Sequence, residues 1–160
     1  RSMTMKKTAL SLMLAGAIAL PGLAQARPVT LSTQLKNYGG EGAYLAVYVT
    51  DAQGKYQKTL WVSGKKAKYY KNLRDWARGS GLKSAEFDGV SGASVGSGRT
   101  LKVTVELADA LIDAGYEIRI DSAVEDGRDY PAEVRTPLTK AGSGQSAAGR
   151  GYVQTFTYKL

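Results

Sequence analysis

The chain has 160 residues and a formal net charge of +8 at neutral pH, and it contains neither Cys nor His. These two absences exclude disulfides, thiolate nucleophiles, Ser-His-Asp triads and Cys- or His-based zinc sites. The basic excess favours anionic partners in general. Because no run of five basic residues forms a concentrated patch, we expect no nucleic-acid partner.

Residues 1–26 have the pattern of a cleavable secretory signal peptide. Lys6 and Lys7 precede an apolar run from Thr8 to Leu20, and Ala24-Gln25-Ala26 is a small-x-small cleavage site. The apolar run is shorter than the roughly 20 residues that span a bilayer. We therefore expect cleavage after Ala26, a periplasmic location, no membrane insertion afterwards, and a mature single domain of residues 27–160.

Alternating apolar and β-branched segments with turn residues between them indicate a two-sided antiparallel sheet protein. Asp51-Ala52-Gln53-Gly54 predicts a hairpin between the second and third of these segments. The predicted strands are Val29 to Leu35, Ala43 to Val49, Lys58 to Val62, Thr100 to Leu107, Tyr116 to Ser122 and Tyr152 to Leu160.

One segment departs from the strand pattern. From Ala67 to Ala77 the apolar residues recur at helical spacing, and Gly79 follows as a predicted C-cap, so we expect a short amphipathic helix. The Gly-, Ser- and Ala-rich stretch from Ala141 to Arg150 predicts a mobile loop. The tryptophans Trp61 and Trp76 fit two interpretations, core residues or a stacking wall for a flat cofactor.

The stretch Asp88-Gly-Val-Ser-Gly-Ala-Ser94 carries the most specific chemical signal. Such a composition is typical of a surface loop, and its glycine spacing fits neither a dinucleotide fingerprint nor a P-loop. The seven residues resemble the flavinylation motif Asp-x-x-Ser/Thr-Gly-Ala-Ser/Thr of FMN-carrying subunits in sodium-pumping and related reductases. In those subunits an FAD-dependent FMN transferase joins the FMN phosphate to the last hydroxyl of the motif.

By this resemblance Ser94 accepts the FMN. The resemblance also implies recognition positions at Asp88, Ser91, Gly92 and Ala93.

The wider chain resembles the periplasmic domain-of-unknown-function family DUF2271. The similarity lies in Tyr44 to Val49, Thr59 to Val62, Leu73 to Trp76 and the Asp88 to Ser94 motif, with Ser94 where Thr is commoner. Members of that family resemble partners of PepSY-type membrane reductases and occur beside the FMN transferase. Together with the strand pattern, the resemblance implies a mainly β fold, an immunoglobulin-like antiparallel β-sandwich with one short inserted helix.

Three functions follow as hypotheses. The first is an electron carrier with covalent FMN on Ser94, in which Trp61 and Trp76 flank the flavin and Arg74, Arg99 or Lys102 interact with its phosphate or reduced ring. The second is a cofactor-free sandwich that binds a ligand or partner protein. The third, an autonomous hydrolase, is least favoured. The chain lacks His and Cys, and its carboxylates show no paired spacing that would indicate a general acid and base.

Overall fold

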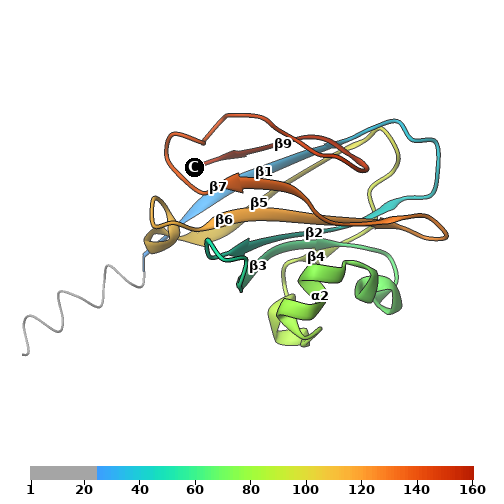
Figure 1. Cartoon of the computed structure of the whole chain (residues 1–160), viewed down its shortest axis with the longest axis horizontal. Coiled ribbons are helices and arrows are strands. Elements are labelled where there is room, and N and C mark those ends of the chain that lie inside the picture. Colours follow the sequence, from blue (N-terminus) through green and yellow to red (C-terminus); the bar gives the residue numbers. More distant parts are fainter. Residues whose placement is uncertain (1–24) are drawn as a thin grey trace, which may run out of the picture.

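The computed structural model describes residues 25–160, which form two packed β-sheets with a layer of short helices below one of them (Figure 1). One sheet has the strand order β5-β1-β9-β8, and the other has the order β4-β3-β2-β6-β7. The strands are β1 (Ala26–Leu35), β2 (Ala43–Thr50), β3 (Tyr56–Ser63), β4 (Ser91–Gly92), β5 (Thr100–Ala108), β6 (Glu117–Val124), β7 (Asp129–Pro137), β8 (Ala147–Ala148) and β9 (Val153–Lys159).

The predicted mainly β sandwich with an inserted helix is confirmed, and all six predicted strands are present. The named strand pairs are antiparallel except for β3 and β4, which run parallel. Strand β1 begins at Ala26, the last residue of the expected signal peptide, whose other residues up to 24 lie outside the described part of the chain. Cleavage after Ala26 would therefore shorten β1 by one exposed residue.

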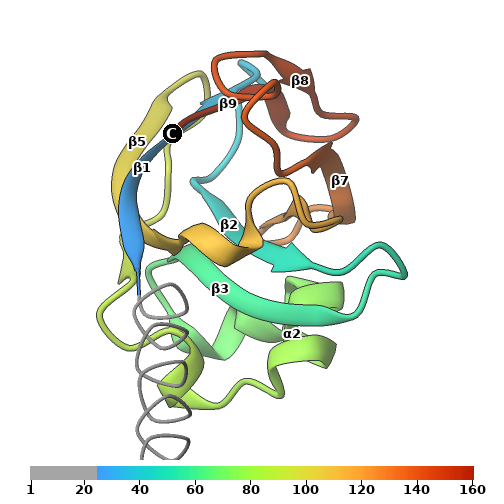
Figure 2. The ribbon, with the colours of Figure 1, turned by 90° about the vertical axis from the view of Figure 1, so that its left-hand side faces the viewer.

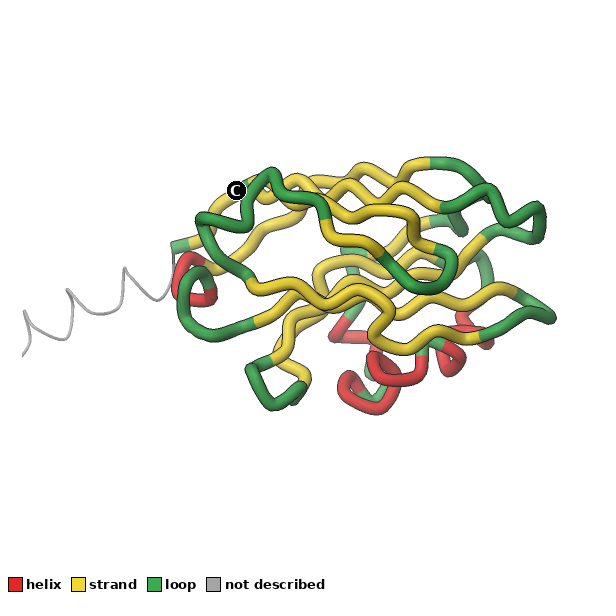
Figure 3. Tube along the Cα trace, turned by 45° about the horizontal axis from the view of Figure 1, so that its top comes forward, coloured by secondary structure: helices red, strands yellow, loops and turns green. Residues whose placement is uncertain are grey.

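Strand β2 is buried along its whole length because it is covered on both faces. Its odd-numbered positions from Ala43 to Val49 face the core between the two sheets, where they meet residues of β1, β5 and β9. Tyr44, Ala46 and Tyr48 face the opposite way, into a second core beneath the helical layer. Figure 3 shows the resulting order of layers, with the two sheets above and the helices below. Successive side chains of a strand point to opposite faces, so alternate residues of β2 enter the two cores.

The predicted helix over 67–77 is two shorter pieces. A 3₁₀ helix, η1 (Ala67–Asn72), ends at Leu73, whose ψ of 78° interrupts the helix, and α2 (Arg74–Ser80) follows. The C-cap is Gly81, in the left-handed conformation at φ 67°, and the prediction of Gly79 was wrong. Gly79 instead allows close packing of α2 against β3, because a Cβ there would overlap with Tyr56.

Strand β7 was not predicted, because Pro131 and the left-handed Ala132 (φ 44°) interrupt its alternation. Its buried Glu133 joins the two sheets: the carboxylate accepts hydrogen bonds from the backbone N–H of Gly151 (2.8 Å) and Val153 (3.2 Å) at the start of β9. The stretch from 141 to 150 consists largely of turns, as expected for a loop. It also contains β8, which pairs with β9.

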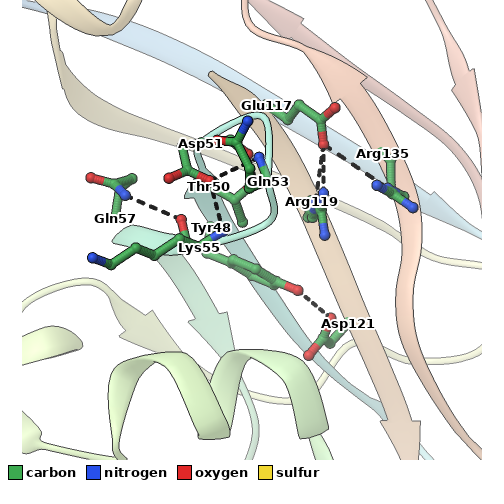
Figure 4. Close-up of polar contacts among 10 residues, drawn as sticks. All are labelled: Tyr48, Thr50, Asp51, Gln53, Lys55, Gln57, Glu117, Arg119, Asp121 and Arg135. Atoms are coloured by element: carbon green, nitrogen blue, oxygen red, sulfur yellow. Dashed lines mark hydrogen bonds and ion pairs between the residues drawn. The ribbon is translucent and has the colours of Figure 1, made fainter. Parts of the chain in front are cut away.

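The antiparallel sheet gives the sandwich two ends separated by the length of β2. Ala43 lies at one end, together with the loop after β4, because Ala43 and Val95 form a β-bridge. Thr50 lies at the other end and leads into the hairpin at Asp51, whose carboxylate accepts hydrogen bonds from the N–H groups of Gln53 and Lys55 (Figure 4). This hairpin confirms the predicted turn.

Candidate functional site

The Asp88 to Ser94 segment crosses the open side of the sandwich. It follows the short 3₁₀ helix η2 (Ser84–Glu86), runs along the edge of β3 as β4, and then continues to β5 in the other sheet (Figure 2). Backbone hydrogen bonds from Val62 N to Val90 O and from Gly64 N to Gly92 O, both 2.9 Å, hold it in place. The motif therefore lies on an accessible sheet edge with a fixed register.

The hydroxyl of Ser94 is held by one hydrogen bond. Its Oγ accepts from the backbone N–H of Lys65 at 2.9 Å, and the next residue, Val95, exchanges two backbone hydrogen bonds with Ala43. Within residues 25–160 the Ser94 proton has no acceptor. The oxygen is therefore positioned while its proton remains available.

The two neighbouring serines differ from Ser94. Ser97 Oγ accepts from Gly39 N at 2.9 Å and lies 3.3 Å from Asn37 Oδ1, to which it donates, so it ties two loops together. Ser91 is exposed on β4, and its hydroxyl makes no hydrogen bond within the described residues. Only Ser94 combines a fixed oxygen with a free proton.

Trp61 lies directly against the motif. It is half-buried at the edge of the inter-sheet core, and its indole N–H donates to Ser63 Oγ at 3.0 Å. A Cβ built on Gly92 would lie 2.8 Å from Cζ2 of this ring, so the ring or the strand would have to shift to admit a side chain. The packing of Trp61 therefore disfavours a side chain at Gly92, two residues before Ser94.

Trp76 lies elsewhere. Its side chain is completely buried in the second core, where its indole N–H donates to Thr59 Oγ1 at 2.9 Å and its ring packs edge-on against Tyr70 and Phe87. In this conformation it offers no face to a flavin. Of the two interpretations, the structure therefore places Trp76 in the core.

A surface hollow opens beside Ser94. Arg99 lines it together with Ser94 and bends back over Gly96, where a Cβ would be 3.3 Å from the arginine Cγ. The other two cations considered for the site lie apart from this hollow: Lys102 faces a different hollow on the outer surface of its sheet, and Arg74 begins α2. The lining residues are Ala93, Ser94, Val95, Gly96, Arg99, Thr100 and Leu101.

Asp88 lies at the other end of the motif. It is exposed, its backbone N–H donates to Ser84 O at 2.8 Å, and it lines a separate hollow with Lys58 and Glu86. Its carboxylate makes no contact with Ser94 in the described chain. No three carboxylates among residues 25–160 gather as a metal site.

Comparison with known proteins identifies the family. Residues 26–155 match the family model described as "Predicted periplasmic protein (DUF2271)". The chain belongs to this family. Neither a curated protein nor a solved structure matches it.

Membership of DUF2271 confirms the periplasmic location that the N-terminal segment predicts. No helix in the described part of this DUF2271 chain is long and apolar enough to span a bilayer.

One residue of the candidate site was missed by sequence reasoning. Lys65 precedes Ser94 by 29 residues, and nothing in the motif points to it. Only the parallel pairing of β3 with β4 brings the two together, and that pairing involves two residues of β4, too few to give a strand pattern.

Proposed function

We propose that this protein is a periplasmic electron carrier that bears FMN on Ser94, attached through a phosphoester by an FAD-dependent FMN transferase. The observation that supports it best is the state of the Ser94 hydroxyl. The last residue of the motif has its oxygen fixed by Lys65 N–H, its proton free, and a hollow beside it. Ser97, only three residues on, has its hydroxyl engaged on both sides.

The attachment reaction balances with FAD as the FMN donor. Ser94 Oγ attacks the phosphorus on the FMN side of the FAD pyrophosphate, so an Oγ–P bond forms and the P–O bond to AMP breaks. The serine proton passes to a base of the transferase, and AMP leaves. The small, exposed Ala93 directly before the acceptor leaves room for the transferase active site.

The residues beside Ser94 fit a flavin phosphoester. Arg99 supplies a cation in the hollow, and Leu101 and Val95 supply apolar surface. Trp61 adds an aromatic edge against Gly92. When bound, FMN supplies the one- and two-electron chemistry that no side chain of this protein provides. A PepSY-type membrane reductase is the proposed electron partner.

Intact mass of the mature protein tests the proposal. The protein is incubated with the transferase, FAD and a divalent metal, and the expected increment is FMN minus water. Ser94→Ala should abolish this increment, Ser94→Thr should retain it because a hydroxyl survives, and Ser97→Ala is the matched control that should label like the wild type. Full labelling of Ser94→Ala would reject the acceptor assignment.

The proposed recognition residues should affect the rate of FMN labelling. Ser91→Ala and Asp88→Ala keep the acceptor hydroxyl, so both should slow labelling without preventing it. If the wild-type chain gains no mass under these conditions, the flavoprotein proposal fails. The alternative, a cofactor-free sandwich that binds a ligand or partner, would then be the better description.

Trp61 provides a separate optical test. Trp61→Leu should change the fluorescence of the attached flavin while leaving the mass increment intact, because aromatic rings near a flavin alter its emission. Trp76→Phe, a conservative change in the second core, is the matched control and should leave the emission unchanged. Native fluorescence in Trp61→Leu would show that Trp61 serves only the core.

A further inference from the structure

Lys65 occupies a rigid turn against the motif. The chain leaves β3 at Ser63, and the next two N–H groups both point at the motif: Gly64 N donates to Gly92 O and Lys65 N donates to Ser94 Oγ, each at 2.9 Å. Gly64 is buried, and any Cβ there would overlap with the ring of Tyr44. The position of the Lys65 backbone relative to Ser94 is therefore fixed by packing.

Two basic residues close to Ser94, Lys65 and Arg99, form no ion pair within residues 25–160. Lys65 is exposed, and no carboxylate in residues 25–160 pairs with it. The adjacent Lys66 differs, because its ammonium lies 4.0 Å from Glu125 and its N–H donates to Tyr44 Oη at 3.0 Å. Arg99, in the hollow that Ser94 lines, also has no acidic partner in the described chain. Lys65, whose backbone contacts Ser94, and Arg99, which shares the hollow with it, are thus two basic residues without an ion-pair partner among residues 25–160.

We infer that Lys65 forms the anion-binding side of the Ser94 site: its backbone N–H stays on Ser94 Oγ, and its ammonium binds the outer oxygens of a phosphoryl group joined to that Oγ. A backbone N–H and a flexible ammonium are a common pair of donors for phosphate oxygens. The identity of the phosphoryl group rests on the proposed function. The attraction of anions to Ser94 does not depend on that function.

A reporter thiol measures this attraction without any flavin. Because the chain contains no Cys, Ser94→Cys introduces a single thiol at the site. Its rate of reaction is measured with an anionic disulfide, 5,5′-dithiobis(2-nitrobenzoate), and with a neutral one, 4,4′-dithiodipyridine. The ratio of the two rates cancels the thiolate fraction that both reactions share, so its change between variants reports the local potential.

Removal of one nearby cation should lower this ratio about three- to fivefold at low salt. We expect that decrease for Lys65→Gln in the Ser94→Cys chain, little change for Lys65→Arg, and convergence of all ratios at high salt. Lys55→Gln is the matched control, because Lys55 is exposed in the hairpin at the other end of the sandwich. An unchanged ratio in Lys65→Gln, or an equal decrease in Lys55→Gln, overturns the inference.

Labelling kinetics test the phosphoryl part. With transferase and FAD, Lys65→Gln should gain the FMN mass more slowly than the wild type, and Lys65→Arg should recover the rate. Labelling of Lys65→Gln at the wild-type rate would overturn the assignment of a phosphoryl group to Lys65. The two proposals fail separately. If the wild type gains no FMN but the ratio of thiol rates still depends on Lys65, only the flavin proposal is rejected. If the wild type gains FMN but the ratio is the same in Lys65→Gln, only the role of Lys65 is rejected.

Discussion

Ser94 and Asp121 are two polar groups of this sandwich with opposite surroundings. The Asp121 carboxylate on β6 is completely buried and accepts three hydrogen bonds of 2.7 Å, from Tyr48 Oη, Trp76 N and Ala132 N. Figure 4 shows the first of these. Ser94 is partly exposed and accepts one. Asp121 joins the helical layer and β7 to the sheet, whereas the Ser94 hydroxyl proton has no acceptor among the described residues.

The comparison shows that a perturbed pKa does not by itself mark a functional group. Burial raises the pKa of Asp121, and hydrogen bonds from Trp76, Ala132 and Tyr48 only partly oppose this effect. A search for perturbed carboxylates would select Asp121 first. Asp121 is nevertheless bound by three donors of the fold and is completely buried, so we assign it to stability.

The largest expected effect is that of Asp121→Ala. Three buried donors would lose their acceptor, so the free energy of unfolding should fall by about 3–5 kcal/mol. Urea denaturation of the mature protein measures this, or a failure to fold shows it directly. A loss below about 1 kcal/mol would contradict the structural role assigned to Asp121.

Tyr48→Phe should have the next largest effect. It keeps the buried ring and removes only the hydroxyl that donates to Asp121, which should cost about 2 kcal/mol because the acceptor is a buried carboxyl group. Thermal unfolding, followed by circular dichroism, gives the value. FMN labelling should stay at the wild-type rate, and slower labelling in a folded variant would mean that the two regions are coupled.

Gly92→Ala tests the contact between the motif and Trp61. The new methyl group would meet the indole edge, so we expect a loss of about 1 kcal/mol. The loss should shrink in a Trp61→Leu background, since the obstructing ring is gone. The four unfolding free energies of this double-mutant cycle decide the point, and strict additivity would show that the ring and the glycine do not constrain one another.

Among the serines of the loop, Ser94 should give the smallest effect of all. Ser94→Ala should cost about 0.5 kcal/mol, because an exposed N–H loses one acceptor that water can replace. Ser97→Ala should cost about 1 kcal/mol, because two hydrogen bonds between loops are lost. Chemical denaturation of both variants would reveal the difference. A greater loss in Ser94→Ala would mean that Ser94 serves the fold.

The sequence by itself determined the class of fold and the place of the motif. Alternation along β2 and the Asp51 hairpin specify strands because side chains on a strand face opposite sides and a turn needs particular residues. The same local rules failed where backbone geometry is irregular. Leu73 divides the predicted helix, and Ala132 interrupts the pattern of β7.

Only the tertiary structure decided which residues share the site. Trp61 and Trp76 are equivalent candidates in the sequence, yet one packs on Gly92 and the other is enclosed in the second core. Lys65 reaches Ser94 through strand pairing. Local patterns report the period and propensity of neighbouring residues, whereas the contacts of a site arise between strands far apart in the chain, and their pairing depends on the packing of the whole molecule.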